Sequence, residues 1–339
     1  MNRRARTVAG DVAAAELGLT LPHEHLVSAL TSKLAPPEDD PSWPLLDAPI
    51  TAALAAGVRA APYSSRDNLT MTEDLALAEL LEFGQEGGGA VVDQTASDLG
   101  RDLPALRRLA AATGLHVIAA CGVYLPLSAE GLERRDPGEL AAGWVAELTA
   151  DPAAGGVPCG VIGEISVSAR LRPAERVALL AAAQAHAATG APVSLHAVLP
   201  ETALAALDLL AAEGVAAGRV AVSHADSLVD RGYQRELAAR GVFVEFDYLG
   251  WHHVAGLDAN GDGDRERVAA AAALIRGGAA GQVLLSQDVV TRIQCTRFGG
   301  GGYVHILRAL APFFEAEGVS GDELRAVMTH NPAAWLAWS

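Results

Sequence analysis

Short apolar runs and longer alanine- and leucine-rich segments alternate along almost the whole chain. The apolar runs predict strands at 17–25, 90–95, 116–122, 160–165, 193–197, 220–225, 242–248 and 283–288. Between them lie helix patterns such as DLPALRRLAAATG, PAERVALLAAAQAHAATG and TALAALDLLAAEG, each ending in a glycine that suits a helix C-terminus. Eight strands with helical spacers of this length predict a parallel (β/α)8 barrel, the TIM-barrel fold of the α/β class. A doubly wound open sheet is the alternative.

Neither an internal repeat nor a domain boundary interrupts this pattern, so residues 1–339 are expected to form one barrel domain with a short N-terminal arm. Two connections are unusually long. The first, from Leu26 to about Thr72, is rich in Pro, Asp and Ser, and is expected to follow the outside or the rim of the barrel. The second, LGWHHVAGLDANGDGDRER, follows the seventh strand and is expected to form a substrate-facing loop above the barrel mouth.

The composition is that of a folded protein with a sizeable core, because half of the residues are hydrophobic and 19% are charged. A formal net charge of −16 argues against nucleic acid and anionic membrane surfaces as partners. No apolar run reaches the length that a bilayer requires. The cysteines Cys121, Cys159 and Cys295 show no paired spacing, which favours a reducing compartment. Lys33 is the only lysine in an arginine-rich chain, a bias that we attribute to genomic base composition.

Side chains that commonly bind metals stand at the ends of the predicted strands. In chain order they are His23, His25, Glu164, His196, His224 and Asp288. A period of two places both imidazoles of the HEH motif on one face of the first strand. The strands of a (β/α)8 barrel bring their C-terminal ends to one face, where active sites of this fold lie. Six such side chains exceed the needs of one zinc ion, so the pattern predicts a binuclear metal centre at the C-terminal mouth.

Each of these residues also has an interpretation without a metal. The histidines could be hydrogen-bonded core residues, Glu164 could pair with an arginine inside the barrel, and Asp288 could cap a helix. An unpaired buried carboxylate is costly, so Glu164 must be neutralised, paired or bound to metal, and its two oxygens could bridge two cations. Asp288 ends the last strand, beside the first, where it could bind a metal and accept a proton from a metal-activated water.

Five segments carry a resemblance to a known family: TVAGDVAAAELGLTLPHEHL, VVDQTASDLGRDLPALRRLAAATGLHVIAACGVY, LLSQD, GGGYVHIL and NPAAWLA. Together they resemble the phosphotriesterase family of the amidohydrolase superfamily, over a stretch from Thr7 to Ala337. The resemblance implies a (β/α)8 barrel, a binuclear zinc-type centre, and hydrolysis of an ester, a lactone or a phosphotriester. It also implies that His23, His25 and Asp288 bind the more buried metal, and that the more exposed metal is bound by His196 and His224.

One position departs from the best-known members of that family, in which a carbamylated lysine on the fourth strand bridges the metals. Glu164 stands at this position here, as a glutamate does in other members, and is expected to bridge directly. Lys33 follows the first strand and is not a candidate for the bridge by its position. The departure weakens the transfer of organophosphate activity to this chain.

Further residues are expected to contact the substrate. Tyr124 matches a tyrosine that lies over the metal pair in the lactonase branch and can contact the carbonyl or leaving oxygen; a rim aromatic without a catalytic role is the alternative. That branch has an arginine where this chain has Tyr248. An aromatic wall facing two arginines would suit a compact anionic substrate better than a neutral triester. Its expected members are Tyr248, Trp251, His252 and His253 on one side, and Arg292 and Arg297 on the other.

These observations predict a metal-dependent hydrolase that acts on a lactone or a carboxylic ester. A hydroxide held between two metals would attack the carbonyl, and Asp288 would carry the proton to the leaving oxygen. Hydrolysis of phosphotriesters, phosphoesters or cyclic amides at the same centre, and a catalytically silent binding protein, are the alternatives. The expected cofactors are two divalent ions, zinc with manganese or cobalt as substitutes. The expected protein is a cytoplasmic homodimer with a small-molecule substrate, binding neither nucleic acid nor membrane.

Overall fold

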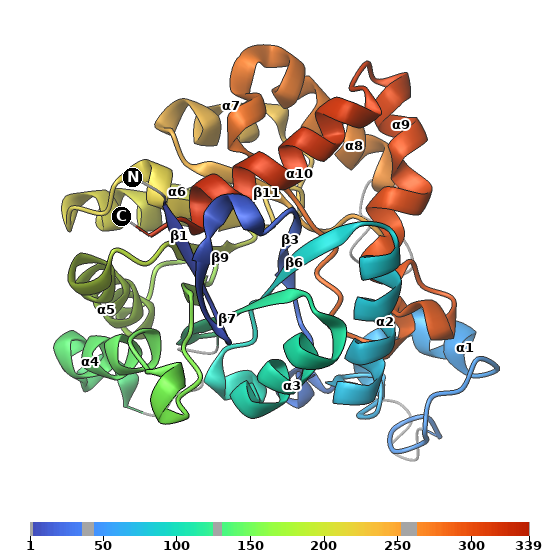
Figure 1. Ribbon diagram of the computed structural model, residues 1–339, viewed down its shortest axis with the longest axis horizontal. Coiled ribbons are helices and arrows are strands. Elements are labelled where there is room, and N and C mark those ends of the chain that lie inside the picture. Colours follow the sequence, from blue (N-terminus) through green and yellow to red (C-terminus); the bar gives the residue numbers. More distant parts are fainter. Residues whose placement is uncertain (1–2, 36–43, 125–130, 252–262, 339) are drawn as a thin grey trace.

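Eight parallel strands form one sheet that curls into a nearly closed barrel, as the alternating pattern predicted (Figure 1). The computed structural model describes residues 3–35, 44–124, 131–251 and 263–338. The strands follow one another around the barrel in chain order: β3 (Leu19–Glu24), β6 (Gly88–Asp93), β7 (His116–Val123), β8 (Val161–Val167), β9 (Val193–Ala197), β10 (Val220–Ser223), β11 (Phe243–Phe246) and β12 (Val283–Leu285). This order excludes the doubly wound alternative, in which the first and last strands do not meet.

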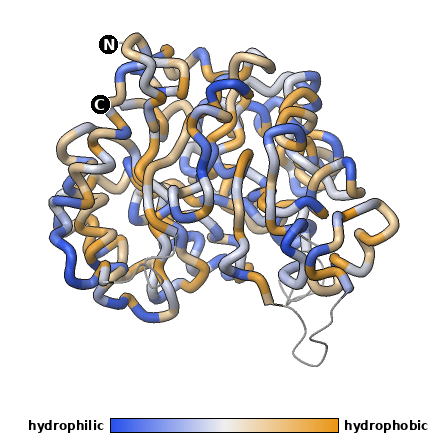
Figure 2. The backbone as a smooth tube through the Cα atoms, turned by 90° about the horizontal axis from the view of Figure 1, so that it is seen from below, coloured by the Kyte–Doolittle hydropathy of each residue, from blue (hydrophilic) through white to orange (hydrophobic). Residues whose placement is uncertain are grey.

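Helices connect the strands and surround the barrel (Figure 1). Three of them end at the glycines expected from the sequence, because Gly114, Gly190 and Gly214 have positive φ angles of 72°, 74° and 87°. Hydrophobic and hydrophilic stretches alternate along the outer part of the tube in Figure 2, since each helix packs one face on the barrel. The main helices are α2 (Glu73–Gln85), α3 (Leu103–Thr113), α4 (Pro137–Leu148), α5 (Pro173–Thr189), α6 (Pro200–Ala212), α7 (Arg231–Arg240), α8 (Gly263–Leu274), α9 (Ala311–Ala316) and α10 (Gly321–Leu336).

The interior of the barrel contains an apolar layer and a polar layer. Along the strands, alternate residues belong to a small buried cluster distinct from the larger cluster under the helices, and this small cluster includes Ala90, Val92, Ile118, Ala120, Val161, Ala221, Phe243 and Leu284. In β11 the same alternation continues from Phe243 to Glu245 and, just past the end of the strand, to Asp247. Both carboxylates are fully buried. The strands therefore change from apolar to polar interior side chains towards their C-terminal ends.

Several strands end earlier than the sequence predicted. We expected strands at 220–225 and 283–288, but β10 ends at Ser223 and β12 ends at Leu285. His224 and Asp288 lie outside regular strand and have φ angles of 60° and 48°, in the left-handed region that non-glycine residues rarely enter. The backbone turns at these two positions, and the extended pattern cannot continue through them.

The seam of the barrel lies between β3 and β12, where a buried carboxylate replaces part of the strand pairing. Glu24 accepts hydrogen bonds from the Ser286 hydroxyl at 2.9 Å, from Gln287 N at 2.9 Å and from Val289 N at 2.8 Å. Only a few backbone bonds cross here, such as Asp288 N to the His23 carbonyl at 3.1 Å. Glu24 therefore holds the loop after β12 against β3.

We expect the Glu24→Ala variant to lower the free energy of unfolding by roughly 2–5 kcal/mol, because two buried backbone N–H groups lose their acceptor. Urea unfolding of the metal-free protein, followed by circular dichroism, measures this change. The exposed Glu213 provides a control, and the Glu213→Ala variant should unfold within about 0.5 kcal/mol of the parent chain. Equal stability of the two variants would show that Glu24 does not hold the seam.

The long connection after β3 contributes to the mouth of the barrel as well as to its outside. β4 (Ser28–Ala29) pairs in antiparallel fashion with β5 (Thr70–Met71), and α1 (Ala55–Ala60) lies between them in the chain. The N-terminal arm is a hairpin of β1 (Arg4–Thr7) and β2 (Gly10–Ala13), and Trp338 N donates to the Arg4 carbonyl at 2.8 Å. The two ends of the chain consequently lie side by side (Figures 1 and 2). Among the described residues, no helix is both long and apolar enough to cross a membrane.

Candidate metal centre

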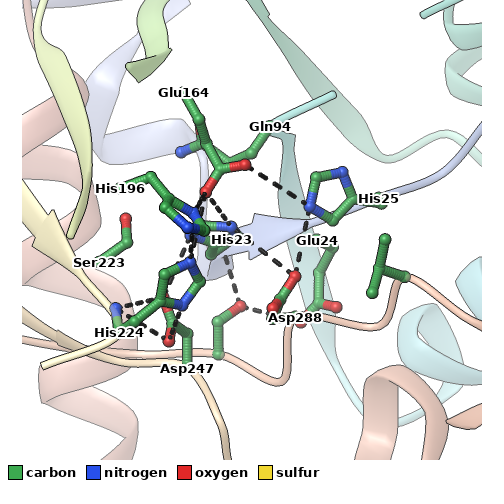
Figure 3. A network of polar contacts seen from close by, with 12 residues as sticks. His23, Glu24, His25, Gln94, Glu164, His196, Ser223, His224, Asp247 and Asp288 are labelled. Carbon is green, nitrogen blue, oxygen red and sulfur yellow. Dashed lines mark hydrogen bonds and ion pairs between the residues drawn. The ribbon is translucent and has the colours of Figure 1, made fainter. Parts of the chain in front are cut away.

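The structure brings all six predicted metal-binding side chains together at the C-terminal ends of the strands (Figure 3). Glu164 of β8 lies in the middle of the group. Its Oε1 is 2.8 Å from His196 Nδ1, 3.2 Å from His23 Nε2 and 3.4 Å from His224 Nε2. Its Oε2 is 3.9 Å from His25 Nε2. All four histidines therefore approach the side chain of Glu164.

Asp288 lies on the side of the two first-strand histidines. Its Oδ1 is 3.2 Å from His25 Nε2 and 3.8 Å from His23 Nε2. The ligand atoms form two groups, each within 4.8 Å: His23, His25 and Glu164 in one, and Glu164, His196 and His224 in the other. Since Glu164 belongs to both groups, the arrangement is that of two metal positions sharing one carboxylate.

In three of the four histidines, His25, His224 and His23, the second ring nitrogen is held by a fixed partner. His25 Nδ1 lies 2.9 Å from the Thr95 hydroxyl, and His224 Nδ1 lies 2.8 Å from Asp247 Oδ1. His23 Nδ1 lies 3.2 Å from Asp247 Oδ2. Imidazoles that bind metals are commonly oriented in this way, because a bond at one nitrogen fixes the ring and its tautomer. The Nε2 atom of each of these three rings then faces Glu164.

These donors fit divalent metal ions. Among the described residues, buried His23 Nε2 forms no hydrogen bond, although Glu164 Oε1 lies 3.2 Å away, and this is a costly state for a polar atom unless a ligand occupies it. His196 Nδ1 and His224 Nε2 also face each other at 2.7 Å. Burial opposes ionisation of Glu164, yet the charges of His196 and His23 hold the pKa of its carboxyl well below the ordinary value. Imidazole nitrogen and ionised carboxylate are the donors that zinc and related ions bind.

Asp247 supports two histidines of the candidate centre and was not predicted from the sequence. It follows β11. Its carboxylate accepts a hydrogen bond from the backbone N of His224 at 3.1 Å and lies 2.8 Å from His224 Nδ1, in addition to its contact with His23. Burial opposes its ionisation, but the charges of His224 and His23 keep the pKa of Asp247 below the ordinary value. The sequence VFVEFDY places Asp247 at the end of an apolar strand. Only the pairing of β10 with β11 shows which histidine this aspartate supports.

Asp247→Asn is expected to weaken metal binding and turnover by about 10- to 100-fold, the usual effect of removing a carboxylate that orients metal-bound histidines. The reason is that one carboxylate orients two rings, one from each metal group. Competition with a chromogenic chelator measures the affinity, and the Asp230→Asn variant, changed at the N-cap of α7, is the matched control. Unchanged metal affinity in the Asp247→Asn variant would contradict this role.

A cavity of about 50 Å³, partly open to solvent, lies against the predicted metal ligands, and this described part is smaller than a typical ligand site. Three of the predicted substrate-contacting aromatics line it. The Tyr124 ring meets His196 edge-on at 4.9 Å, and the Tyr248 ring stacks on His224 at 4.7 Å. The Trp251 ring lies 4.7 Å from Tyr248. The described lining is His25, Leu30, Tyr63, Leu99, Tyr124, Glu164, His196, His224, Tyr248, Trp251, Asp288 and Val290.

The two predicted arginines are not among these lining residues. Arg292 Nη2 forms an ion pair with Asp67 at 3.1 Å, and its Nε donates to the Thr70 carbonyl at 2.8 Å. Arg297 is exposed, and its guanidinium lies 5.8 Å from the Phe298 ring centroid. Arg292 thus ties the loop after β12 to the long connection after β3, and neither arginine belongs to the described wall of the cavity. His252 and His253 lie outside the described residues.

Comparisons with known proteins agree with this geometry. A model of the phosphotriesterase family matches residues 3–336. An N-acetyltaurine hydrolase from Tetraodon nigroviridis is 31% identical over 346 residues, which cover 100% of this chain and 99% of that protein. A resiniferatoxin-binding protein from Rhodobacter sphaeroides is 33% identical, with a TM-score of 0.92 over 98% of this chain and 95% of that one. The phosphotriesterase homology protein from Escherichia coli, solved with phosphate in its active site, is 26% identical, with a TM-score of 0.77 over 95% of this chain and 99% of that one.

Proposed function

The chain belongs to the phosphotriesterase family and is a metal-dependent hydrolase, and we propose that it cleaves a carboxylic acyl bond. The observation that carries the proposal is the cavity in which Glu164 joins two groups of metal-type ligands, with Asp288 in its wall. Attack on a carbonyl is the step common to the lactone and ester hydrolysis expected from the sequence and to amide hydrolysis.

The metal positions are assigned to His23, His25 and Asp288 on one side, His196 and His224 on the other, and Glu164 between them. Two divalent ions bound there supply a Lewis acid for the substrate carbonyl and lower the pKa of water towards neutrality. Among the chain's own groups, the Asp288 carboxylate is the proposed proton acceptor from the attacking water. It then delivers that proton to the leaving oxygen or nitrogen.

Tyr124 is proposed to contact the substrate carbonyl or the leaving atom. Burial raises the pKa of the Tyr124 hydroxyl well above its ordinary value, and the nearby charges of Glu164 and Asp288 act in the same direction. The hydroxyl therefore stays protonated at neutral pH and can donate a hydrogen bond where negative charge develops. Leu99 and Trp251 contribute apolar surface to the remainder of the cavity.

Relatives favour an amide as the acyl substrate. The N-acetyltaurine hydrolases of Tetraodon nigroviridis and of other animals match this chain over essentially its full length. N-Acetyltaurine is an acyl amide, whose hydrolysis releases an amine and so requires a proton for the leaving nitrogen. The Asp288 carboxylate adjacent to His25 is suited to this transfer, and the same apparatus would serve a lactone or an ester.

The alternative activities make different demands on the same site. The Escherichia coli relative was solved with phosphate, which makes phosphoester hydrolysis the second enzymatic candidate. The Rhodobacter sphaeroides relative is described as a binding protein, which corresponds to a silent barrel. The complete set of ligands around Glu164 favours catalysis over binding alone.

A substrate panel with metal analysis tests the proposal. The protein is loaded with zinc, manganese or cobalt, its metal content is measured, and hydrolysis of acyl amides, lactones, aryl esters, phosphomonoesters and paraoxon-type triesters is compared. We expect near two metal equivalents per chain and the highest kcat/KM for a carbonyl substrate. A phosphoester as best substrate, or full metal loading without any hydrolysis, would refute the proposal. We also propose that zinc is the native metal, that the protein forms a homodimer and that it is located in the cytoplasm.

A further inference from the structure

Apart from its histidines and the two proposed metal positions, the described wall of the cavity has no cationic group. The whole chain has a formal net charge of −16, which repels anions at long range. An anionic group at the end of the substrate remote from the metal positions would therefore need a local cation at the mouth. Arg292 does not supply it, because its guanidinium pairs with Asp67.

Lys33, the only lysine of the chain, lies at this mouth. It ends the short turn Thr31–Lys33 directly after β4, and Lys33 N donates to the carbonyl of the cavity residue Leu30 at 3.0 Å. Two residues later, Ala35 N donates to the carbonyl of Tyr63, a second cavity residue, at 2.8 Å. The turn thus starts from one cavity residue, Leu30, and is tied to another, Tyr63, by the Ala35 bond.

The side chain of Lys33 extends over the ring of a predicted catalytic residue. Its Nζ lies 5.4 Å from the centroid of Tyr124, whose ring lies 4.9 Å from the metal-ligand candidate His196. The ammonium, the tyrosine and the metal ligands therefore follow one another along the cavity. Cation–π contacts at exposed sites are weak, so the ammonium can turn to an anion without a large loss.

We propose that Lys33 determines substrate specificity by binding an anionic group, a sulfonate or a carboxylate, at the end of the substrate remote from the cleaved acyl bond. The proposal rests on the proposed acyl-bond hydrolysis and adds the substrate class. Lysine presents three donors on a flexible stem and suits a tetrahedral sulfonate or a mobile carboxylate, without the planar fit that arginine demands. The name N-acetyltaurine hydrolase, borne by full-length relatives, is consistent with this class, because taurine carries a sulfonate.

Matched substrates separate this role from a structural one. The pair is 2-acetamidoethanesulfonate and the neutral 2-acetamidoethanol, with 3-acetamidopropanoate as the carboxylate. Lys33→Gln is expected to lower kcat/KM for the two anions by about 10- to 100-fold, mainly through KM, and to change the neutral substrate less than about threefold. Lys33→Arg should restore most of the loss. Arg235→Gln removes an exposed positive charge on α7 and is the control, which should leave the anion preference unchanged.

Two kinetic results would overturn the assignment. One is a wild-type enzyme that hydrolyses the neutral and anionic amides equally well. The other is a Lys33→Gln variant that loses activity equally on all three substrates, which would indicate a structural role. Failure of the proposed acyl hydrolysis looks different, because the wild type would then hydrolyse neither these three amides nor the lactones and esters of the substrate panel.

A binding measurement tests Lys33 without turnover. Since the chain has one lysine, labelling with ¹³C- and ¹⁵N-lysine produces a single side-chain methylene signal next to Nζ. We expect propanesulfonate to shift this signal saturably in the metal-loaded protein, while propanol and sodium chloride at equal ionic strength do not. A signal that propanesulfonate leaves in place at millimolar concentration, or that chloride shifts equally, would overturn the proposal whatever the reaction catalysed.

Discussion

The Glu164→Ala variant is expected to lose metal binding and at least about 10³ in kcat/KM, because each 1.36 kcal/mol of lost transition-state stabilisation is a factor of ten and bound metals supply several kcal/mol. All four histidines approach this one carboxylate, and it belongs to both groups of ligand atoms. Without it, the imidazoles of His23 and His196 lose the anion that they share. Elemental analysis should show one metal equivalent or less per chain.

Two further variants make this result specific. Glu164→Gln preserves the volume and one oxygen but removes the charge, so it should retain more metal than Glu164→Ala and still turn over slowly. Glu236→Ala, changed on the exposed face of α7, should behave as the parent. If the Glu164→Ala variant binds two metals and turns over normally, a bridging role for this glutamate is wrong.

The arrangement of the strands was predictable because the signals for it are local. Each strand is a short apolar run, and several helices end at a glycine such as Gly114 or Gly190. The meeting of His23 with His196 follows from the fold alone, since parallel strands bring their C-terminal ends to one mouth. The barrel class and the candidate centre therefore required no knowledge of contacts between distant segments.

The features that could not be predicted depend on the register between neighbouring strands. Asp247 supports His224 because β11 lies beside β10, and Glu24 meets the Ser286 hydroxyl only across the barrel seam. His224 and Asp288, in the turns that follow β10 and β12, have positive φ angles, and such angles depend on tertiary bonds. An apolar run in the sequence carries none of this information.

The long connection after β3 was the least predictable part of the site. Its Asp67 neutralises Arg292, which the sequence offered as an anion-binding residue. The same connection places Lys33, excluded as a bridge by its position, beside Tyr124 at the cavity mouth. The path of a proline-rich loop is determined by where it packs, so the charges that face the substrate had to be read from the structure.

Asp288→Asn is expected to retain the fold and part of the metal while turnover falls by about 10²-fold or more, the range for loss of a general base. Asparagine has nearly the same shape and keeps one oxygen for His25. It also tolerates the φ angle of 48° at this position, because asparagine enters the left-handed region more readily than most residues. The fall should therefore come from the lost proton acceptor and not from the backbone.

Comparison with Asp288→Ala distinguishes proton transfer from metal binding. Alanine removes the ligand oxygen as well as the base and is poorly suited to the left-handed conformation, so this variant should lose metal, stability and activity together. Turnover and elemental analysis of both variants under zinc saturation measure the difference. Asp230→Asn, at the N-cap of α7, controls for the chemical change itself, since asparagine caps a helix as well as aspartate does. An Asp288→Asn variant with full metal and near-normal turnover would leave Asp288 as a metal ligand only, because a side chain without a basic oxygen cannot take the proton from water.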